Sequence, residues 1–387
     1  MHKFTALIVA ATCALLTPQP AAQDVKPDRR FTAWDKNKDG RLTRGELPKQ
    51  ERKNFARVDV DMDGFISLAE HQAFRRSSSS PRPAQTRRAS VPKGMVTKTN
   101  IAYAGTDNPR QVLDLAVPKK RAHNNPLPVL VYIHGGAWRH GSKNGGLSQI
   151  AHFLETSRYA GVSVGYRLSQ EKIWPAQIHD CKAAIRWIKA NSKKYGLDPK
   201  RIAVCGHSAG GHLGAMLGLT GDQKELEGKL GSHQDQNSQV AAVIDFFGPT
   251  QFLLMDSKPG TMVHDDPGSP ESQLVGGPIQ SNKKKTLHAS PLTYASKNDG
   301  PFLIIHGTTD MIVPCHQSEI LDAALDKLGV ESTLIRVRGA GHGVHGRLLD
   351  EIGLSFLDRQ FYRGKARLAD KIIERKDLTR ARKRDQR

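Results

Sequence analysis

A serine flanked by glycines marks the part of the chain that is best suited to catalysis. Residues 206–210 read Gly-His-Ser-Ala-Gly, so Ser208 has a glycine two positions away on either side. A serine of this kind lies on a sharp turn between a strand and a helix, where larger flanking side chains would clash. Its hydroxyl then lies at the positive end of a helix, which favours developing negative charge. Ser208 is a candidate nucleophile, with a chance match in a glycine-rich chain as the alternative.

An acid and a histidine later in the chain could activate this serine. Asp310 ends the segment His-Gly-Thr-Thr-Asp, and His342 lies in Gly-Ala-Gly-His-Gly, each following an apolar run. The acid would fix the imidazole tautomer, and the imidazole would take the serine proton and return it to the leaving group. The chain order Ser, Asp, His is that of α/β-hydrolases. His342 is preferred as the base over three competing histidines, which are His207 in the turn, His306 in a strand and His345 beyond the loop.

A glycine pair after another apolar run could supply the oxyanion donors. Residues 134–138 read His-Gly-Gly-Ala-Trp. Small residues there let backbone N–H groups point into a cavity, each typically worth about 3 to 4 kcal/mol in the transition state. The expected donors are Gly135, Gly136, Ala137 and Ala209. An ordinary glycine-rich turn is the alternative.

Alternating strands and helices must position these groups. Apolar runs predict strands at residues 129–133, 159–166, 202–205, 240–247, 301–306 and 332–337, and residues 175–195 show helical spacing. This alternation predicts an α/β fold, a mostly parallel sheet with helices on both faces. Two polar stretches, 220–239 and 250–293, are expected to be insertions over the active site.

Residues 94–365 resemble an α/β-hydrolase of the esterase/lipase superfamily. The motifs are H-G-G-x-W, G-x-S-A-G-G and H-G-x-x-D-x-x-V-P, together with Tyr166-Arg-Leu and the stretch from Pro175 to Asp180. They are most similar to the hormone-sensitive-lipase-like and feruloyl-esterase-like branch. The resemblance implies an α/β-hydrolase fold, with Ser208 as nucleophile, Asp310 as acid and His342 as base. Ala137 departs from the third glycine of lipase-like members and fits the H-G-G-x-W branch, which also contains formamidases.

Two segments near the N-terminus fit the twelve-residue calcium loop of the EF-hand. Each has oxygen-bearing side chains at positions one, three and five, a glycine at six and a glutamate at twelve. The candidate ligands are Asp35, Asn37, Asp39, Arg41 (carbonyl), Thr43, Glu46, Asp59, Asp61, Asp63, Phe65 (carbonyl), Ser67 and Glu70. Position eight, Leu42 and Ile66, can pair as a small sheet. Pro48 shortens the first exiting helix, which favours two structural Ca²⁺ sites over a calmodulin-like switch, with no cofactor for catalysis.

The remaining segments predict export and a basic surface. Residues 1–22 read as a signal peptide, residues 27–75 as a small all-α EF-hand pair, residues 76–93 as a Ser/Pro/Arg-rich linker and residues 366–387 as a basic tail. The formal charge is +20, concentrated in this linker and tail. Such segments suit an anionic polysaccharide or a cell surface, and nucleic acid is the least expected partner. No membrane span is expected once the signal is removed, and Cys181, Cys205 and Cys315 are assigned no disulfide.

The sequence thus predicts a secreted or periplasmic serine esterase. The expected substrates are short-chain or aromatic acyl esters, on small molecules or polysaccharide. One alternative is an amide or peptide hydrolase, like the prolyl oligopeptidases or the formamidases, although no propeller precedes the catalytic region. The other is a calcium-dependent surface-binding protein with an inactive hydrolase fold, which the intact set of catalytic residues disfavours.

Overall fold

The computed structural model describes residues 29–59, 64–79, 91–123, 125–258 and 260–378. The chain divides into two compact units, with the boundary after residue 82. The predicted signal peptide lies outside the described residues, as do Asp61 and Asp63 of the second predicted calcium loop.

The N-terminal unit consists of short helices and a two-stranded sheet. Its elements are α1 (Arg29–Trp34), β1 (Arg41–Leu42), the 3₁₀ helix η1 (Arg52–Asn54), α2 (Phe55–Val58), β2 (Ile66–Ser67) and α3 (Leu68–Ser79). The predicted pairing of Leu42 with Ile66 is confirmed, in an antiparallel register. Both side chains are buried in a small core with Phe31, Leu47 and Val58. The unit is therefore held by apolar burial around the paired loops.

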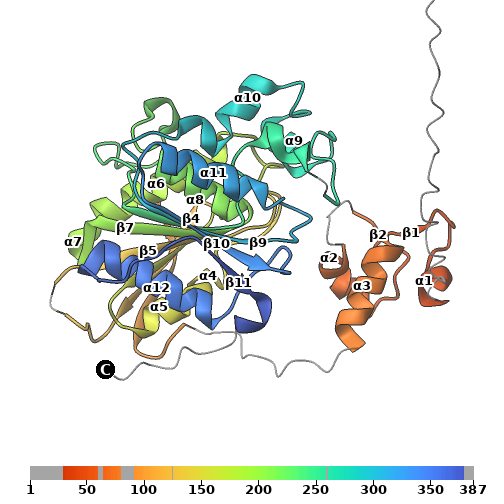
Figure 1. Cartoon of the computed structure of the whole chain (residues 1–387), viewed down its shortest axis with the longest axis horizontal. Coiled ribbons are helices and arrows are strands. Elements are labelled where there is room, and N and C mark those ends of the chain that lie inside the picture. Colours follow the sequence, from red (N-terminus) through yellow and green to blue (C-terminus); the bar gives the residue numbers. More distant parts are fainter. Residues whose placement is uncertain (1–28, 60–63, 80–90, 124, 259, 379–387) are drawn as a thin grey trace, which may run out of the picture. The chain divides into compact units, whose positions relative to one another are not determined.

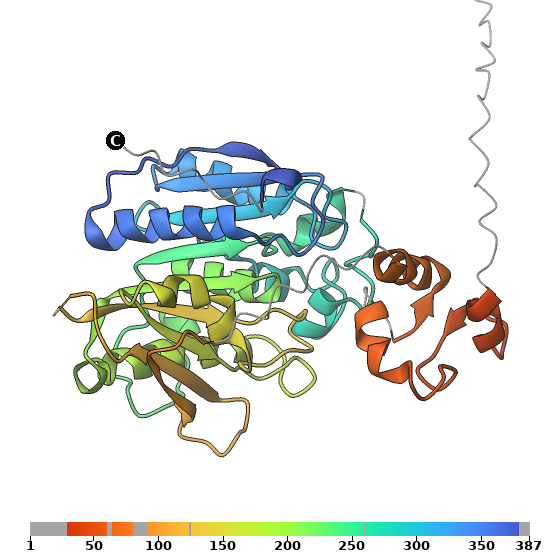
Figure 2. The same cartoon turned by 90° about the horizontal axis from the view of Figure 1, so that it is seen from below.

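The C-terminal unit is built on a nine-stranded sheet. Its strands are β3 (Met95–Ala102), β4 (Val112–Pro118), β5 (Leu127–Ile133), β6 (Ala160–Val164), β7 (Leu197–His207), β8 (Ala242–Phe246), β9 (Phe302–Gly307), β10 (Ser332–Arg338) and β11 (Lys371–Glu374). The strand order is β11-β10-β9-β8-β7-β5-β6-β4-β3. The pairs β3–β4 and β4–β6 are antiparallel and the other pairs of this sheet are parallel, so the sheet is mostly parallel, as predicted. Figure 2 shows the β3–β4 hairpin at one edge and the C-terminal strands at the opposite edge.

Helices cover both faces of this sheet, as the sequence predicts (Figure 1). One face carries α6 (Ala176–Ala190), α8 (Ala209–Leu219) and α11 (His316–Lys327), and the other carries α4 (Gly146–Gln149), α5 (Ala151–Glu155) and α12 (Arg347–Tyr362). The short α7 (Ser192–Tyr195) follows α6. Strands buried on both faces read as continuous apolar runs, which is why β5 and β9 are recognisable in the sequence.

Most predicted strands lie within about two residues of their observed bounds, and three boundaries differ by more. Helix α3 continues to Ser79, into the predicted linker, so the low apolar content of this segment does not mark the end of the helix. Strand β7 begins at Leu197, five residues before the predicted start. The predicted basic tail contains β11, which pairs in parallel with β10 and buries Ile373. This strand was not predicted because the charged residues around it give the segment the composition of a basic tail.

The two predicted insertions differ in structure. The 250–293 stretch contains η3 (Phe252–Ser257), α9 (Pro270–Val275), α10 (Lys283–His288) and the start of η4 (Pro291–Tyr294), and it buries Phe252 and Leu274. The 220–239 stretch contains only η2 (Lys224–Leu226) and is anchored on α6, where Lys182 and Arg186 pair with Glu227. The 220–239 stretch also donates from Gly231 N–H to the Ala104 carbonyl of the β3–β4 connection. Its position over the active site stays a prediction, since these contacts are with α6 and that connection.

Two further properties concern the whole described chain. Cys181 and Cys205 are buried free thiols, and Cys315 is a partly exposed one. None of the helices in the described ranges is both long and apolar enough to cross a membrane.

Candidate active site

Ser208 occupies a strained turn between β7 and α8. Its backbone has φ 55° and ψ −121°, a conformation that L-residues rarely adopt. A Cβ on Gly206 would lie 2.1 Å from the Gly210 carbonyl oxygen, and a Cβ on Gly210 would lie 2.2 Å from that of Ile133. The predicted need for glycine at both flanks is thus met by close backbone approach. Ala209 begins α8, so its N–H has no acceptor within the helix.

The glycine pair after β5 lies against this turn. A Cβ on Gly135 would be 2.6 Å from the His207 carbonyl oxygen and 3.5 Å from the Ser208 Cβ. Gly136, Ala137 and Trp138 all have positive φ, which turns the chain sharply after Gly135. Among the described residues, the N–H groups of Gly135, Gly136 and Ala137 have no protein acceptor. The structure therefore places Gly135 against the serine turn, in a loop whose N–H donors are free.

Trp138 fastens this loop to α8 and to the 250–293 insertion. Its indole N–H donates to His212 Nδ1 at 3.2 Å, and His212 Nε2 donates to the Ala289 carbonyl at 2.7 Å. Burial lowers the pKa of His212 to about 4, so the imidazole is neutral and can accept at one nitrogen while donating at the other. Phe252 packs on both rings, which places the insertion in contact with the loop.

Tyr166 holds the first peptide of the loop. Its hydroxyl donates to the His134 carbonyl at 2.9 Å, and its ring stacks on the His134 imidazole at 4.2 Å. The His134 carbonyl and the Gly135 N–H belong to one planar peptide unit, so fixing the carbonyl also fixes the direction of the N–H. This role was not predicted from the sequence, although Tyr166 begins the Tyr-Arg-Leu motif.

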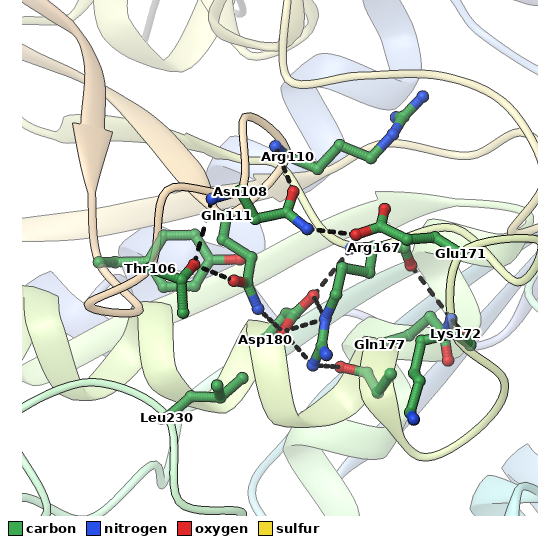
Figure 3. Close-up of polar contacts among 12 residues, drawn as sticks. Thr106, Asn108, Arg110, Gln111, Arg167, Glu171, Lys172, Gln177, Asp180 and Leu230 are labelled. Atoms are coloured by element: carbon green, nitrogen blue, oxygen red, sulfur yellow. Dashed lines mark hydrogen bonds and ion pairs between the residues drawn. The ribbon is translucent and has the colours of Figure 1, made fainter.

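A buried polar network holds the segment that follows Tyr166 (Figure 3). Asp180, which is fully buried on α6, accepts from Arg167 Nη2 at 2.8 Å and from Gln111 Nε2 at 2.6 Å. Gln177 donates to the carbonyls of Arg167 and Lys172. These bonds tie α6 to residues 167–172 and to the β3–β4 hairpin, so two elements hold the segment that follows Tyr166.

Asp310 and His342 meet at the ends of β9 and β10, as predicted. Asp310 Oδ2 accepts from His342 Nδ1 at 2.7 Å, which leaves His342 Nε2 to take a proton. A Cβ on Gly307 would lie 2.3 Å from the Ala340 carbonyl, so this glycine lets the two loops approach. Burial acts to raise the Asp310 pKa, but hydrogen bonds from His306 and His342 outweigh it and hold the pKa well below its usual range. The acid is therefore ionised.

His306 is a second partner of Asp310 that the sequence analysis did not assign. Its Nε2 lies 3.2 Å from Asp310 Oδ2 and 2.8 Å from the Val313 carbonyl, and its Nδ1 lies 2.7 Å from Ser318 Oγ. The side chain is fully buried, which confirms its predicted structural position inside the strand. The four-residue spacing to Asp310 was the signal available in the sequence.

The serine turn and His342 converge on the end of β8. Ser208 N–H donates to the Phe246 carbonyl at 2.8 Å, and His342 packs edge-on against Phe247 at 4.6 Å. The competing His207 stacks on Phe246 with its Nδ1 3.2 Å from the Tyr132 hydroxyl, and burial and the nearby His342 lower its pKa to about 4. The other competitor, His345, is exposed, and its Nδ1 lies 2.9 Å from the Gly343 carbonyl. Of the candidate bases, only His342 is both paired with Asp310 and partly exposed.

The two N-terminal loops repeat one pattern of hydrogen bonds. In the first, Asp35 accepts from Gly40 N–H and Glu46 accepts from Thr43 N–H and Oγ1. In the second, Asp59 accepts from Gly64 N–H and Glu70 accepts from Ser67 N–H and Oγ. Asn37 and Asp39 turn the first loop by accepting from Asp39 N–H and Arg41 N–H. Within the described ranges, no three His, Cys, Asp or Glu side chains form a metal-binding group.

Comparisons with known proteins agree on one family. Residues 113–325 match the family BD-FAE. Esterase LipC of Mycobacterium tuberculosis is 30% identical over 286 residues, covering 72% of this chain and 68% of its own. Among solved structures, a truncated carbohydrate esterase from gut microbiota is 33% identical, with TM-score 0.63, covering 68% of this chain and 96% of its own. Esterase Est2 of Thermogutta terrifontis is 26% identical, with TM-score 0.54, covering 70% of this chain and 94% of its own.

Proposed function

Because the chain belongs to the BD-FAE family of α/β-hydrolase esterases and is a carboxylic ester hydrolase, we propose that it removes short-chain or aromatic acyl groups from carbohydrate esters. The similarity to a carbohydrate esterase supports a sugar as the alcohol. The 250–293 insertion packs on the oxyanion loop and exposes Leu254, Val263 and Leu287, but polar residues separate these positions in the sequence, which supports a soluble substrate over a lipid droplet.

We infer that the reaction proceeds through an acyl-enzyme on Ser208. The hydroxyl oxygen would attack the acyl carbon while His342 Nε2 takes its proton, and the oxyanion would accept hydrogen bonds from the free loop N–H groups and Ala209. His342 would return the proton to the alcohol as the ester bond breaks. A water molecule, deprotonated by His342, would then attack the acyl-enzyme, and the acid would leave as Ser208 regains its proton. The 2.7 Å bond between Asp310 and His342 beside the strained Ser208 turn carries this proposal.

A substrate panel with a nucleophile variant tests both parts. The panel contains an aryl acetate, acetylated xylan, feruloylated arabinose, a tributyrin emulsion and a prolyl peptide. Ser208→Ala should abolish turnover of every substrate and labelling by an organophosphonate, because the covalent adduct needs the serine oxygen. His345→Ala is the matched control and should retain full activity. Faster cleavage of the peptide than of the esters, or labelling of Ser208→Ala, would refute the proposal.

We propose separately that the N-terminal unit binds calcium. The fit is supported by Asp35 Oδ1, which is buried without a hydrogen-bond partner among the described residues, and by the carboxylates and amide of the first loop. Asp35, Asn37, Asp39, Thr43 and Glu46 would hold one ion with the Arg41 carbonyl, and Asp59, Asp61, Asp63, Ser67 and Glu70 a second with the Phe65 carbonyl. A bound Ca²⁺ would neutralise carboxylates that otherwise repel each other.

Calorimetric titration of the full chain with Ca²⁺ tests this site directly. A twofold stoichiometry, reduced to one by Glu46→Gln, is expected, together with a higher unfolding temperature of the N-terminal unit. Glu51→Gln, a glutamate outside both loops, is the control. Binding that persists unchanged in a Glu46→Gln, Glu70→Gln variant would exclude these loops. Turnover of a soluble ester should stay within about twofold after chelation, because no proposed catalytic group is a metal ligand.

We propose finally that the protein is exported, as the charge and apolar pattern of residues 1–22 indicate. Its basic segments would then meet anionic polysaccharide or a cell surface. Fractionation of the producing cell, with a variant lacking residues 4–16, checks the location.

A further inference from the structure

A second cavity lies outside the proposed catalytic residues. Its volume is about 490 Å³, and it is bounded by α10, η4, the end of α9 and the residues just before α6. Trp174, Val275, Leu287 and Tyr294 line it, and the lining is predominantly apolar. Ile173 and Leu287 contribute two of the few exposed large apolar side chains of the described chain. The cavity is therefore suited to bind an apolar group of a ligand.

Among the polar groups around this cavity, the His288 Nε2–H is a hydrogen-bond donor without a protein acceptor in the described chain. Trp174 Nε1–H donates to His288 Nδ1 at 2.9 Å, so the neutral imidazole carries its proton on Nε2. Tyr294 Oη donates to the His288 carbonyl at 3.0 Å, so this hydroxyl proton is already used. The His288 Nε2–H donates to no acceptor in the described part of the chain. A ligand oxygen would satisfy it.

Two lysines add positive charge to the cavity wall. Lys284 and Lys285 lie in α10, both line the cavity, and both are exposed. Neither ammonium forms an ion pair with any described carboxylate. An anion at the mouth would therefore meet two cations and one N–H donor, and it would be opposed by the Glu225 carboxylate, whose charge acts on His288 and Tyr294.

We propose that this cavity binds an aromatic monocarboxylate. The aromatic ring would pack against Trp174 and Tyr294, whose rings favour offset or edge contacts with another ring. The carboxylate would accept from His288 Nε2–H and face Lys284 and Lys285. Acids of this class are also what an esterase acting on aromatic acyl esters releases, but binding here requires none of the catalytic groups.

The cavity shares an aromatic cluster with the oxyanion loop. The Trp174 ring contacts the His212 ring at 5.6 Å between centroids, and His212 accepts the Trp138 N–H. A ligand on Trp174 therefore lies one ring contact from the side chain that fastens the loop. Ser208, Asp310 and His342 are not among the lining residues, which allows the cavity and the catalytic residues to be tested independently.

Calorimetry on protein whose serine has been blocked tests the proposal. The full chain is first treated with an organophosphonate, so that an acid cannot occupy the catalytic centre. Cinnamate is then titrated, alongside cinnamyl alcohol as the neutral analogue and decanoate as the non-aromatic acid. We expect cinnamate to bind the blocked protein more tightly than either analogue. If the organophosphonate does not label Ser208, the assignment of Ser208 as nucleophile is wrong. The cavity is then tested by titrating cinnamate into the untreated protein and into variants of the cavity residues.

Matched variants locate the binding. Leu287→Asp should weaken cinnamate about tenfold, because it removes an apolar contact and adds a repelling charge. Leu328→Asp, at a site of nearly equal exposure, should have no effect. The double variant Lys284→Gln, Lys285→Gln should weaken cinnamate about threefold and leave cinnamyl alcohol unchanged, whereas Lys283→Gln should change neither.

Three results would overturn the proposal. Cinnamate binding that is lost on phosphonylation would place the acid in the catalytic centre. Equal binding by the Leu287→Asp and wild-type proteins would exclude the cavity. Tighter binding of decanoate than of cinnamate would show that the site is specific for aliphatic chains.

Discussion

Replacing Tyr166 with phenylalanine should slow turnover while leaving substrate binding almost unchanged. The variant keeps the ring that stacks on His134 and removes only the hydroxyl that donates to the His134 carbonyl at 2.9 Å. Because this carbonyl shares a peptide plane with Gly135 N–H, the donor becomes free to rotate away from the oxyanion.

The size of the effect follows from the oxyanion donors. Loss of one such donor costs about 2.7 to 4 kcal/mol in the transition state. Partial misalignment of Gly135 should cost less, about 1.4 kcal/mol, which corresponds to a tenfold lower kcat. The His134 carbonyl also loses its buried donor, at a cost of about 1 to 3 kcal/mol in the free energy of unfolding. A domain of this size should therefore melt a few degrees lower.

Steady-state kinetics with a soluble aryl acetate, together with thermal unfolding, measure both effects. Tyr159→Phe is the control, since its hydroxyl donates to Asp358 Oδ1 at 2.8 Å and its ring packs on Tyr362 of α12, on the opposite face of the sheet from α8. It should lower the unfolding temperature and leave kcat within about twofold. If Tyr166→Phe also lowers only the unfolding temperature, or raises KM with kcat unchanged, the assigned role of Tyr166 is wrong.

Three further outcomes are expected. Asp310→Asn should reduce kcat by about 10⁴ with the fold intact, since the amide favours the wrong His342 tautomer, and a loss below tenfold would argue against the pairing. Gly210→Ala should prevent soluble expression or lower the free energy of unfolding in urea by more than about 3 kcal/mol, because its Cβ would lie 2.2 Å from a backbone oxygen. Gly214→Ala in the same helix should be tolerated, because the nearest atom to its Cβ would be 3.4 Å away. The free energy of unfolding should fall as pH drops from about 6.5 to about 4, because the unfolded chain binds protons that the folded chain excludes. The fall should be up to about 3 kcal/mol each for the buried His134 and His212 and smaller for the part-buried His207, and a flat profile would contradict neutral imidazoles at these positions.

Much of the sheet and the pairing of Asp310 with His342 could be predicted because both rest on local patterns. Strands such as β5 and β9 are buried on both faces and appear as apolar runs, and the Ser208 turn needs glycines at fixed positions. Parallel strands then bring their carboxyl ends to one edge, which places Asp310 beside His342.

The supporting contacts could not be predicted because they join distant parts of the chain. Tyr166 and His134 are 32 residues apart, and Gln111 and Asp180 are 69 apart. Each residue alone looks like an ordinary polar or aromatic side chain, and only the folded sheet brings the partners together. The helices α9 and α10 were missed because segments of six residues carry too little periodicity to distinguish them from loop.

The position of β11 has a consequence for how the chain is made. This strand is synthesised after β10, yet it covers the edge of β10, and the nearby Leu378 carbonyl accepts from Leu348 N–H at the start of α12. Until these residues are synthesised, β10 presents unpaired N–H and C=O groups that can pair with a neighbouring nascent chain. A gene shortened after residue 365 would make that exposure permanent, so its product should collect in inclusion bodies even though every proposed catalytic residue is present.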